Sequence, residues 1–142
     1  AAMNKIQSQS TTSTSSITMA ASVEAISGPQ DFILDHNKKF IKRRDLVVSK
    51  LNEIDGITCS KPDGAFYVYP NCQDILGKIT PNGKKISSDE DFITYLLEDQ
   101  GVAGVHGSAF GLSPYFRLSY ATSDHILEDA CNRIQLACSK LK

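Results

Sequence analysis

An arginine lies in the middle of a segment that has the pattern of a half-buried strand. In YFRLSYAT, residues 115–122, every second side chain is apolar and points to one face, namely Phe116, Leu118 and Tyr120. Arg117 lies on the opposite face. A guanidinium group stays charged at physiological pH and needs a partner where water is removed. Arg117 therefore reaches solvent, pairs with a carboxylate of the protein, or binds a carboxylate that arrives as a ligand.

Two features favour the ligand over an ion pair within the protein. A strand is rigid, so it fixes the guanidinium fork that binds a carboxylate through two parallel hydrogen bonds. The segment HGSAFGLSP, residues 106–114, precedes the strand and is rich in small residues, which leaves room for a small molecule. A structural ion pair of Arg117 remains the alternative.

The other reactive side chains give no recognisable catalytic or metal-binding pattern. No serine or cysteine accompanies a histidine in a known nucleophile motif, and GVHGSAFG matches neither a phosphate loop nor a dinucleotide fingerprint. Three consecutive acids at 89–91 are more typical of a helix N-terminus than of a metal site. We therefore predict no catalytic residue and no metal ligand in this chain. This prediction assigns no catalytic or metal-binding role to the three histidines, His36, His106 and His125.

Periodicity and capping signals predict how the elements alternate along the chain. The expected helices cover 16–27, capped by Ser15 or Ser16, then 29–54, 87–100, and a last helix of 123–141 capped by Thr122 or Ser123. The expected strands are 57–60, 65–69, 102–105 and 115–122. We expect the first two strands to form a hairpin about Lys61–Gly64, with positive φ permitted at Gly64. Ser87 and Glu90 match a capping box.

The expected arrangement is an α+β fold. A small, mostly antiparallel sheet packs against helices, and a long helix precedes it. Residues 8–18, SQSTTSTSSIT, read as a linker or an irregular loop. The cluster KKFIKRR at 38–44 is typical of a solvated helix face.

Composition narrows the classes of partner. The net charge of −1 gives no electrostatic footprint for nucleic acid or for a membrane surface. No apolar run approaches the length of a membrane span, and the first residues do not have the pattern of a signal peptide. The spacing of the four cysteines fits neither a zinc site nor a disulfide framework, so we expect free thiols in the cytoplasm, where thiols stay reduced.

Four stretches together resemble a known family. SGPQDFI…RRDLVVSKLN, KPDGAFYVYP, GVAGVHGSAFG and YFRLSYAT are similar, in that order and spacing, to the C-terminal portion of the aspartate aminotransferases of pyridoxal phosphate (PLP)-dependent fold type I. The opening NKIQSQSTTSTSSITMAA resembles the segment that precedes that portion. GAFY and FRLSYA carry the resemblance jointly.

The resemblance implies a domain organisation and a role for the arginine. Residues 1–28 correspond to the end of the large cofactor-binding domain, near the interface of a homodimer. Residues 29–56 correspond to the long connecting helix, and 57–142 to the small domain that closes over substrate. The arginine of FRLSY, here Arg117, is the residue that binds the substrate α-carboxylate. The implied reaction transfers an amino group between L-aspartate and 2-oxoglutarate through PLP.

The resemblance also implies that part of the active site lies outside these residues. The family's cofactor lysine belongs to an upstream segment, and none of the eleven lysines here stands in a matching context. We therefore expect no cofactor-binding residue in this chain and no transamination by the 142 residues alone. Two alternatives remain: a stand-alone α+β module that binds a carboxylate or a partner protein, and an alanine, aromatic or prephenate-type aminotransferase.

Overall fold

The computed structural model describes residues 1–10 and 14–142, and the chain divides into two units, residues 1–36 and 37–142. In the first unit, α1 (Ala2–Ser10) and α2 (Ser16–Ser27) contain no buried residue. The predicted linker or loop at 8–18 is therefore helical at both of its ends, and its residues 11–13 lie outside the described residues. The division between the units falls within α3 (Asp31–Asn52).

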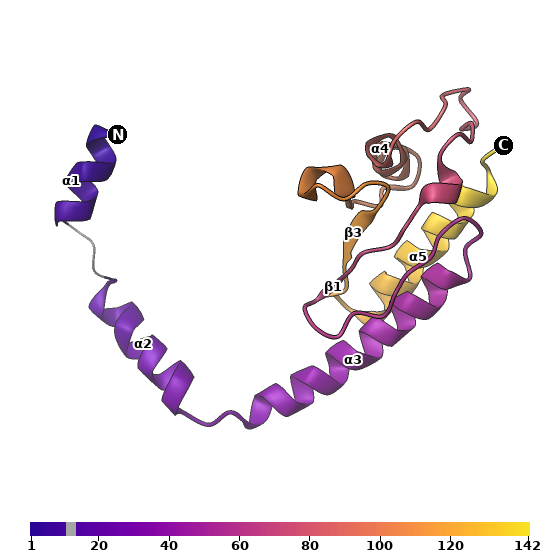
Figure 1. Cartoon of the computed structure of the whole chain (residues 1–142). Helices are drawn as coiled ribbons and strands as arrows, with labels where there is room; N and C mark the ends of the chain where they lie inside the picture. The colour runs from indigo at the N-terminus through magenta and orange to yellow at the C-terminus, as the bar shows by residue number, and fades with distance from the viewer. Residues whose placement is uncertain (11–13) are drawn as a thin grey trace. The chain divides into compact units, whose positions relative to one another are not determined.

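The second unit contains a small antiparallel sheet, which confirms the α+β prediction. Strand β3 (Phe116–Ser119) lies in the middle, between β1 (Tyr67–Val68) and β2 (Val105–His106). Figure 1 labels β1 and β3. Tyr67 pairs with Ser119, and Val105 pairs with Arg117. The predicted strands at 65–69, 102–105 and 115–122 are therefore present, but each is shorter or displaced by a few residues.

The predicted hairpin of 57–60 with 65–69 is wrong. Residues 57–60 form no strand, and Thr58 makes an isolated bridge to Asn71 instead. The reason lies in a side chain at the end of α3. The amide group of Asn52 accepts a hydrogen bond from the N–H of Cys59 at 2.8 Å and donates one to its C=O at 2.9 Å. These two bonds tie the backbone of Cys59 to the helix.

Helices cover one face of the sheet and enclose the core. Helix α5 (Asp124–Ser139) runs beside α3, because Lys42 bonds to Asp124 and Lys50 bonds to Asn132, eight residues further along both helices (Figure 1). The two helices are therefore parallel. Helix α4 (Asp89–Gln100) and the 3₁₀ helix η1 (Gln73–Ile75) complete the unit. The core draws on all of these elements, through Val47, Leu51, Ile75, Phe92, Leu96, Phe116, Tyr120, Leu127 and Ile134.

The start of α4 differs by one residue from the predicted capping box. Ser88, not Ser87, is the N-cap, and its hydroxyl accepts a hydrogen bond from the N–H of Asp91 at 3.1 Å. The carboxylate of Asp91, not that of Glu90, accepts the hydrogen bond from the backbone N–H of Ser87. The helix start is therefore capped by Ser88 and Asp91 in place of Ser87 and Glu90, and the acid accepts its bond from the residue before the N-cap and not from the N-cap itself.

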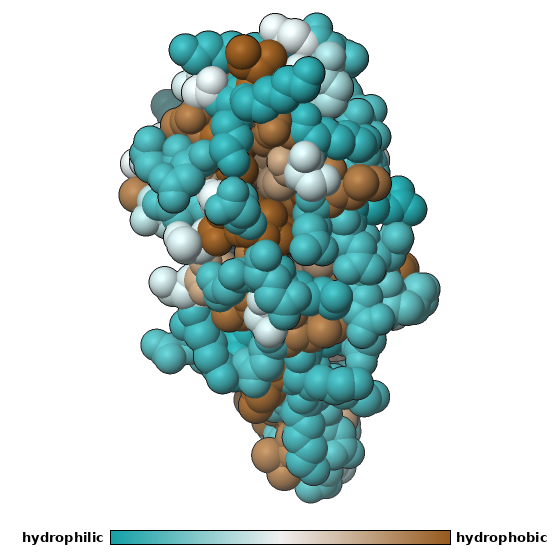
Figure 2. All heavy atoms as spheres, turned by 90° about the vertical axis from the view of Figure 1, so that its right-hand side faces the viewer, coloured by the Kyte–Doolittle hydropathy of each residue, from teal (hydrophilic) through white to brown (hydrophobic). Residues whose placement is uncertain are grey.

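The surface is more hydrophilic than the core on the face that Figure 2 shows. On the face shown in Figure 2, hydrophilic residues predominate and hydrophobic residues show only between them. Part of the basic cluster at 38–44 is not merely solvated, since Lys42 and Arg43 both form ion pairs with Asp124. No helix within the described residues is long and apolar enough to cross a membrane.

Candidate functional site

Arg117 lies on the central strand of the sheet, on the face opposite the core. Its neighbour Phe116 is fully buried, whereas Arg117 itself is half-buried. Backbone pairing on both edges of β3 holds the residue, with β1 on one side and β2 on the other. The alternation predicted from the sequence is therefore present, and the guanidinium starts from a rigid position.

Two aromatic rings lie against the guanidinium. The central carbon of the Arg117 guanidinium is 5.3 Å from the ring centre of Tyr67 and 4.7 Å from that of Phe110. Tyr67 is two residues out of register with Arg117 across the β1–β3 ladder, a diagonal position on the same face that long side chains reach. Contacts of this kind hold a cation by its attraction to the π electrons of the ring.

The guanidinium has no carboxylate partner in the part of the chain that the structure describes. The other arginines differ: Arg43 pairs with Asp124, Arg44 with Asp45, and Arg133 with Asp129. The N–H donors of a guanidinium point outward in the plane of the group, and those of Arg117 donate to no acceptor within the described residues. A half-buried cation with free donors in its plane is suited to receive a carboxylate.

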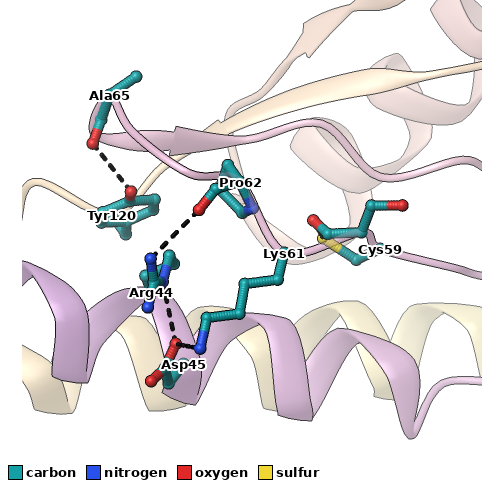
Figure 3. A network of polar contacts seen from close by, with 8 residues as sticks. Arg44, Asp45, Cys59, Lys61, Pro62, Ala65 and Tyr120 are labelled. Atoms are coloured by element: carbon teal, nitrogen blue, oxygen red, sulfur yellow. Dashed lines mark hydrogen bonds and ion pairs between the residues drawn. The ribbon is translucent and has the colours of Figure 1, made fainter.

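A polar network fixes the chain just before β1. Arg44 and Asp45 of α3 lie beneath the 61–65 segment (Figure 3). Arg44 donates to the C=O of Pro62 at 3.2 Å, and the carboxylate of Asp45 lies 2.9 Å from Arg44 Nε and 3.0 Å from Lys61 Nζ. Hydrogen bonding to Arg44, and then to Lys61, lowers the pKa of Asp45, which keeps its carboxylate ionised.

Tyr120 connects this segment to β3. Its hydroxyl donates to the C=O of Ala65 at 2.9 Å (Figure 3). Its backbone N–H donates to the C=O of Phe66 at 2.8 Å. The left-handed residue of the turn is Ala65, with φ 65°, and not Gly64 as predicted. These bonds fix the turn immediately before Tyr67, and so help to place its ring beside Arg117.

The second ring comes from the glycine-rich loop. The 3₁₀ helix η2 (Gly107–Phe110) closes this loop back onto β3, because the N–H of Gly107 donates to the C=O of Tyr115 at 2.6 Å. Gly107 has to be glycine, since a Cβ there would collide with the carbonyl oxygens of Leu112 and Tyr115. The loop is thus tightly packed, so the space that we expected for a small molecule does not lie within the loop itself.

Tyr69 packs behind the loop. Its hydroxyl donates to the C=O of Gly107 at 3.3 Å, and its ring stacks on Tyr115 with centres 5.7 Å apart. Burial raises the pKa of Tyr69, as does the charge of Asp89, while the charge of Arg117 opposes both. The hydroxyl therefore stays protonated and acts as a donor.

The remaining candidates lie away from this arrangement or serve the structure. His36 and His125 are exposed on α3 and α5, and His106 Nδ1 lies 2.7 Å from the hydroxyl of Ser108. Within residues 1–10 and 14–142, no group of three or more His, Cys, Asp or Glu side chains is placed to hold a metal ion. All four cysteines are free and buried.

The sequence reasoning missed the two residues that contact Arg117, Tyr67 and Phe110, and the buried carboxylate of Asp89. The position of Tyr67 beside Arg117 follows from the strand register once β1 is known to pair with β3, but the sequence predicted that residues 65–69 pair with 57–60. Asp89 was assigned only to the helix start, although its side chain is 1% exposed and accepts a hydrogen bond from the N–H of Ser108 at 2.8 Å. An acid in the first turn of a helix carries no sequence signal for such burial.

The elements around Arg117 suit a carboxylate better than a covalently bound cofactor. Residues 66–69, 105–110 and 115–119 contain no lysine, so these segments offer no amine to an aldehyde such as PLP. What they do offer is a fixed cation with free hydrogen-bond donors. The arrangement therefore defines a candidate site for binding an acid.

Comparison with known proteins places the chain in a family. The model of the family Aminotransferase class I and II matches residues 1–134. The chain belongs to this family, whose members depend on PLP. The expected family is thereby confirmed.

Within the family, the chain is similar to aspartate aminotransferases. It is 57% identical over 141 residues to a probable aspartate/prephenate aminotransferase of Rhizobium leguminosarum bv. phaseoli, covering 99% of this chain and 35% of that protein. It is 56% identical to an aspartate aminotransferase of Rhizobium meliloti (strain 1021), covering 99% of this chain and 34% of that protein. The chain thus spans about a third of the length of these relatives.

Solved structures agree with the fold. The aspartate aminotransferase from Rhizobium meliloti superposes with a TM-score of 0.92 at 56% identity, over 99% of this chain and 35% of that one. An aspartate aminotransferase from Thermus thermophilus, solved with maleate, gives a TM-score of 0.78 at 33% identity, over 96% of this chain and 33% of that one.

Proposed function

We propose that the chain works as the C-terminal third of an aspartate aminotransferase, which transfers an amino group between L-aspartate and 2-oxoglutarate, and that Arg117 binds the α-carboxylate of each substrate. The observation that carries this proposal is the guanidinium of Arg117, which contacts the rings of Tyr67 and Phe110 and has no carboxylate partner within the described residues. The names of the similar proteins support the transfer of an amino group and the use of aspartate, and 2-oxoglutarate follows from the resemblance to the family.

Arg117 contributes binding and orientation. A guanidinium presents two parallel N–H donors to the two oxygens of a carboxylate, and this pairing fixes the plane of the acid as well as its position. Tyr67 and Phe110 limit the rotation of the guanidinium, so less side-chain freedom is lost when substrate binds. The amino acid and the oxo acid both carry an α-carboxylate, so the same contact serves both halves of the exchange.

The cofactor is held by residues outside this chain in our proposal. PLP supplies the carbonyl group that accepts the amino group from one substrate and returns it to the next. Arg117 fixes the α-carbon of the substrate relative to that group, and the small domain excludes water around it. By the same analogy with the family, we propose a homodimer in the cytoplasm; four free, buried thiols are compatible with a reducing compartment.

Prephenate is a second candidate amino acceptor. Several relatives, including those of Rhizobium leguminosarum and Cereibacter sphaeroides, are named aspartate/prephenate aminotransferases. Prephenate carries a 2-oxo acid group, so Arg117 would bind it in the same manner. A stand-alone module that binds carboxylates without catalysis is the alternative outside the enzyme class.

A chimaera tests the proposal. The matching third of the Rhizobium meliloti aspartate aminotransferase is replaced by residues 1–142, and the purified protein is assayed with PLP, L-aspartate and 2-oxoglutarate, and then with prephenate. We expect turnover of aspartate comparable to that of the parent enzyme. A chimaera that folds and binds PLP but transfers no amino group from aspartate would contradict the proposal and favour the stand-alone module.

A further inference from the structure

Asp89 is a buried carboxylate that the proposed binding of substrate does not use. Its side chain is 1% exposed, and it is the only buried charged side chain within the described residues. A buried carboxylate is costly unless hydrogen bonds compensate it. Asp89 accepts one such bond from the backbone N–H of Ser108, at 2.8 Å. Ser108 belongs to η2, the helix whose last residue is Phe110.

Capping does not explain the burial of Asp89. At the start of α4, the cap is made by Ser88 and Asp91, whose side chains bond to each other and to the backbone of Ser87 and Asp91. Glu90 occupies the same first turn and is exposed, so it shares the favourable position near the helix dipole without being buried. The carboxylate of Asp89 is directed instead at the glycine-rich loop.

The helix that carries Asp89 is rigid. Phe92 and Leu96 of α4 are 0% and 1% exposed, and Tyr95 bonds through its hydroxyl to the C=O of Ala137 in α5 at 3.1 Å. A hydrogen bond from this helix therefore connects η2 to the core. Because η2 spans only Gly107–Phe110, fixing Ser108 also restricts the backbone two residues later.

We propose that Asp89 is a positioning residue, whose carboxylate holds η2 so that the ring of Phe110 lies against the guanidinium of Arg117. The chain of contacts runs from Asp89 to the N–H of Ser108, along η2 to Phe110, and across 4.7 Å to Arg117. The role in substrate binding rests on the proposed function of Arg117. The ordering of the loop does not.

The first experiment measures the loop in the 142-residue chain. Amide hydrogen exchange at Ser108 and the NMR signal of the Arg117 Nε–H group are recorded for Asp89→Ala, Asp89→Asn and the control Glu90→Ala. In Asp89→Ala we expect exchange at Ser108 to rise about 10- to 100-fold, the range that loss of a hydrogen bond to a charged group gives. In Asp89→Asn, exchange at Ser108 should be intermediate between that of Asp89→Ala and that of the control Glu90→Ala, since a neutral acceptor gives a weaker bond.

The signal of Arg117 reports the contact with the ring. In Asp89→Ala it should move toward the position found in Phe110→Leu, which removes the ring at an exposed position. Glu90→Ala should leave exchange at Ser108 and the Arg117 signal unchanged. The proposal is overturned if Asp89→Ala and Glu90→Ala behave alike. If Asp89→Ala does not fold, Asp89→Asn decides: exchange equal to that of Glu90→Ala overturns the proposal.

The second experiment measures substrate binding in the chimaera. Phe110→Leu and Asp89→Asn should raise KM for aspartate, up to about two- to fivefold for loss of one ring contact, and leave kcat nearly unchanged. A fall in kcat at constant KM would overturn the positioning role. The two proposals fail differently. If Arg117 does not bind substrate, Arg117→Ala leaves turnover intact while exchange at Ser108 still responds to Asp89.

Discussion

Replacing Arg117 by alanine in the chimaera removes the group on which the proposed function depends. Truncating one partner of a buried, hydrogen-bonded charge pair costs about 2–5 kcal/mol or more. Arg117 is only half-buried, so we do not expect the top of this range to be reached. A loss of about 2–4 kcal/mol corresponds to a fall in kcat/KM of about 30- to 1,000-fold. Arg117→Lys keeps the charge but loses the planar fork, and it should fall between alanine and the unchanged protein.

The assay measures kcat/KM for L-aspartate and for 2-oxoglutarate, together with the PLP content of each variant. Both substrates should be affected, because both carry the α-carboxylate, while PLP content should stay unchanged. Arg133→Ala is the matched control, since Arg133 is an exposed arginine of α5 that pairs with Asp129 at 2.7 Å. If Arg117→Ala keeps the activity of Arg133→Ala with both substrates, the assignment of Arg117 is refuted.

Other expected outcomes concern the fold and the isolated chain. Tyr120→Phe loses the hydrogen bond to the C=O of Ala65, so urea unfolding should show a loss of about 0.5–1.5 kcal/mol, whereas Tyr115→Phe should show less; equal losses would contradict the role of Tyr120. Burial raises the pKa of Cys59 and Cys131 to about 11 and that of Cys72 and Cys138 to about 12, against 9.0 in the unfolded chain. The protonated thiols therefore contribute stability that is fully present below pH 9.0 and is lost as the pH rises through the pKa values of the folded protein. A free energy of unfolding that is no lower at pH 10 than at pH 7 would contradict this prediction. The 142-residue chain mixed with PLP, L-aspartate and 2-oxoglutarate should form no oxaloacetate, and steady formation of oxaloacetate would show that the cofactor lysine is not needed from outside.

Local patterns were sufficient to predict most of the elements around the site. The alternation at 115–122 places Phe116 in the core and Arg117 on the other face, as observed. In the helix predicted at 87–100, the spacing of Phe92, Tyr95 and Leu96 predicts a buried face, and all three residues are buried in α4. Such patterns succeed because burial of one face imposes a period of two on a strand and of about 3.6 on a helix.

Pairing and partner choice were not predictable from the same patterns. A strand period says nothing of which strand lies beside it, and the side chain of Asn52 determines that the backbone of Cys59 is tied to α3 instead of forming a hairpin. In the last helix, the spacing of Ile126, Ala130, Ile134, Ala137 and Leu141 predicts a single buried stripe, but Ile126 is 48% exposed. The buried residues of α5 are Leu127, Cys131, Ile134, Ala137 and Cys138. The prediction was correct in the middle of the helix and wrong toward its ends, because it had not counted the two cysteines as core residues.

The surroundings of Arg117 depended on contacts distant in sequence. The charge, the strand and the exposed face were all visible in YFRLSYAT. The two rings were not, because Tyr67 reaches the guanidinium through the β1–β3 register and Phe110 through the closure of η2. The sequence therefore identified the cation, and the structure supplied the groups that hold it.

A crystal structure of the chimaera with bound maleate, the dicarboxylate present in the Thermus thermophilus structure, tests the central claim most directly. We predict one carboxylate of maleate paired with Arg117 through two parallel N–H···O contacts of about 2.7–2.9 Å, with the rings of Tyr67 and Phe110 still against the guanidinium. Maleate bound elsewhere, with the Arg117 guanidinium paired to an aspartate or glutamate of the protein itself, would contradict the account.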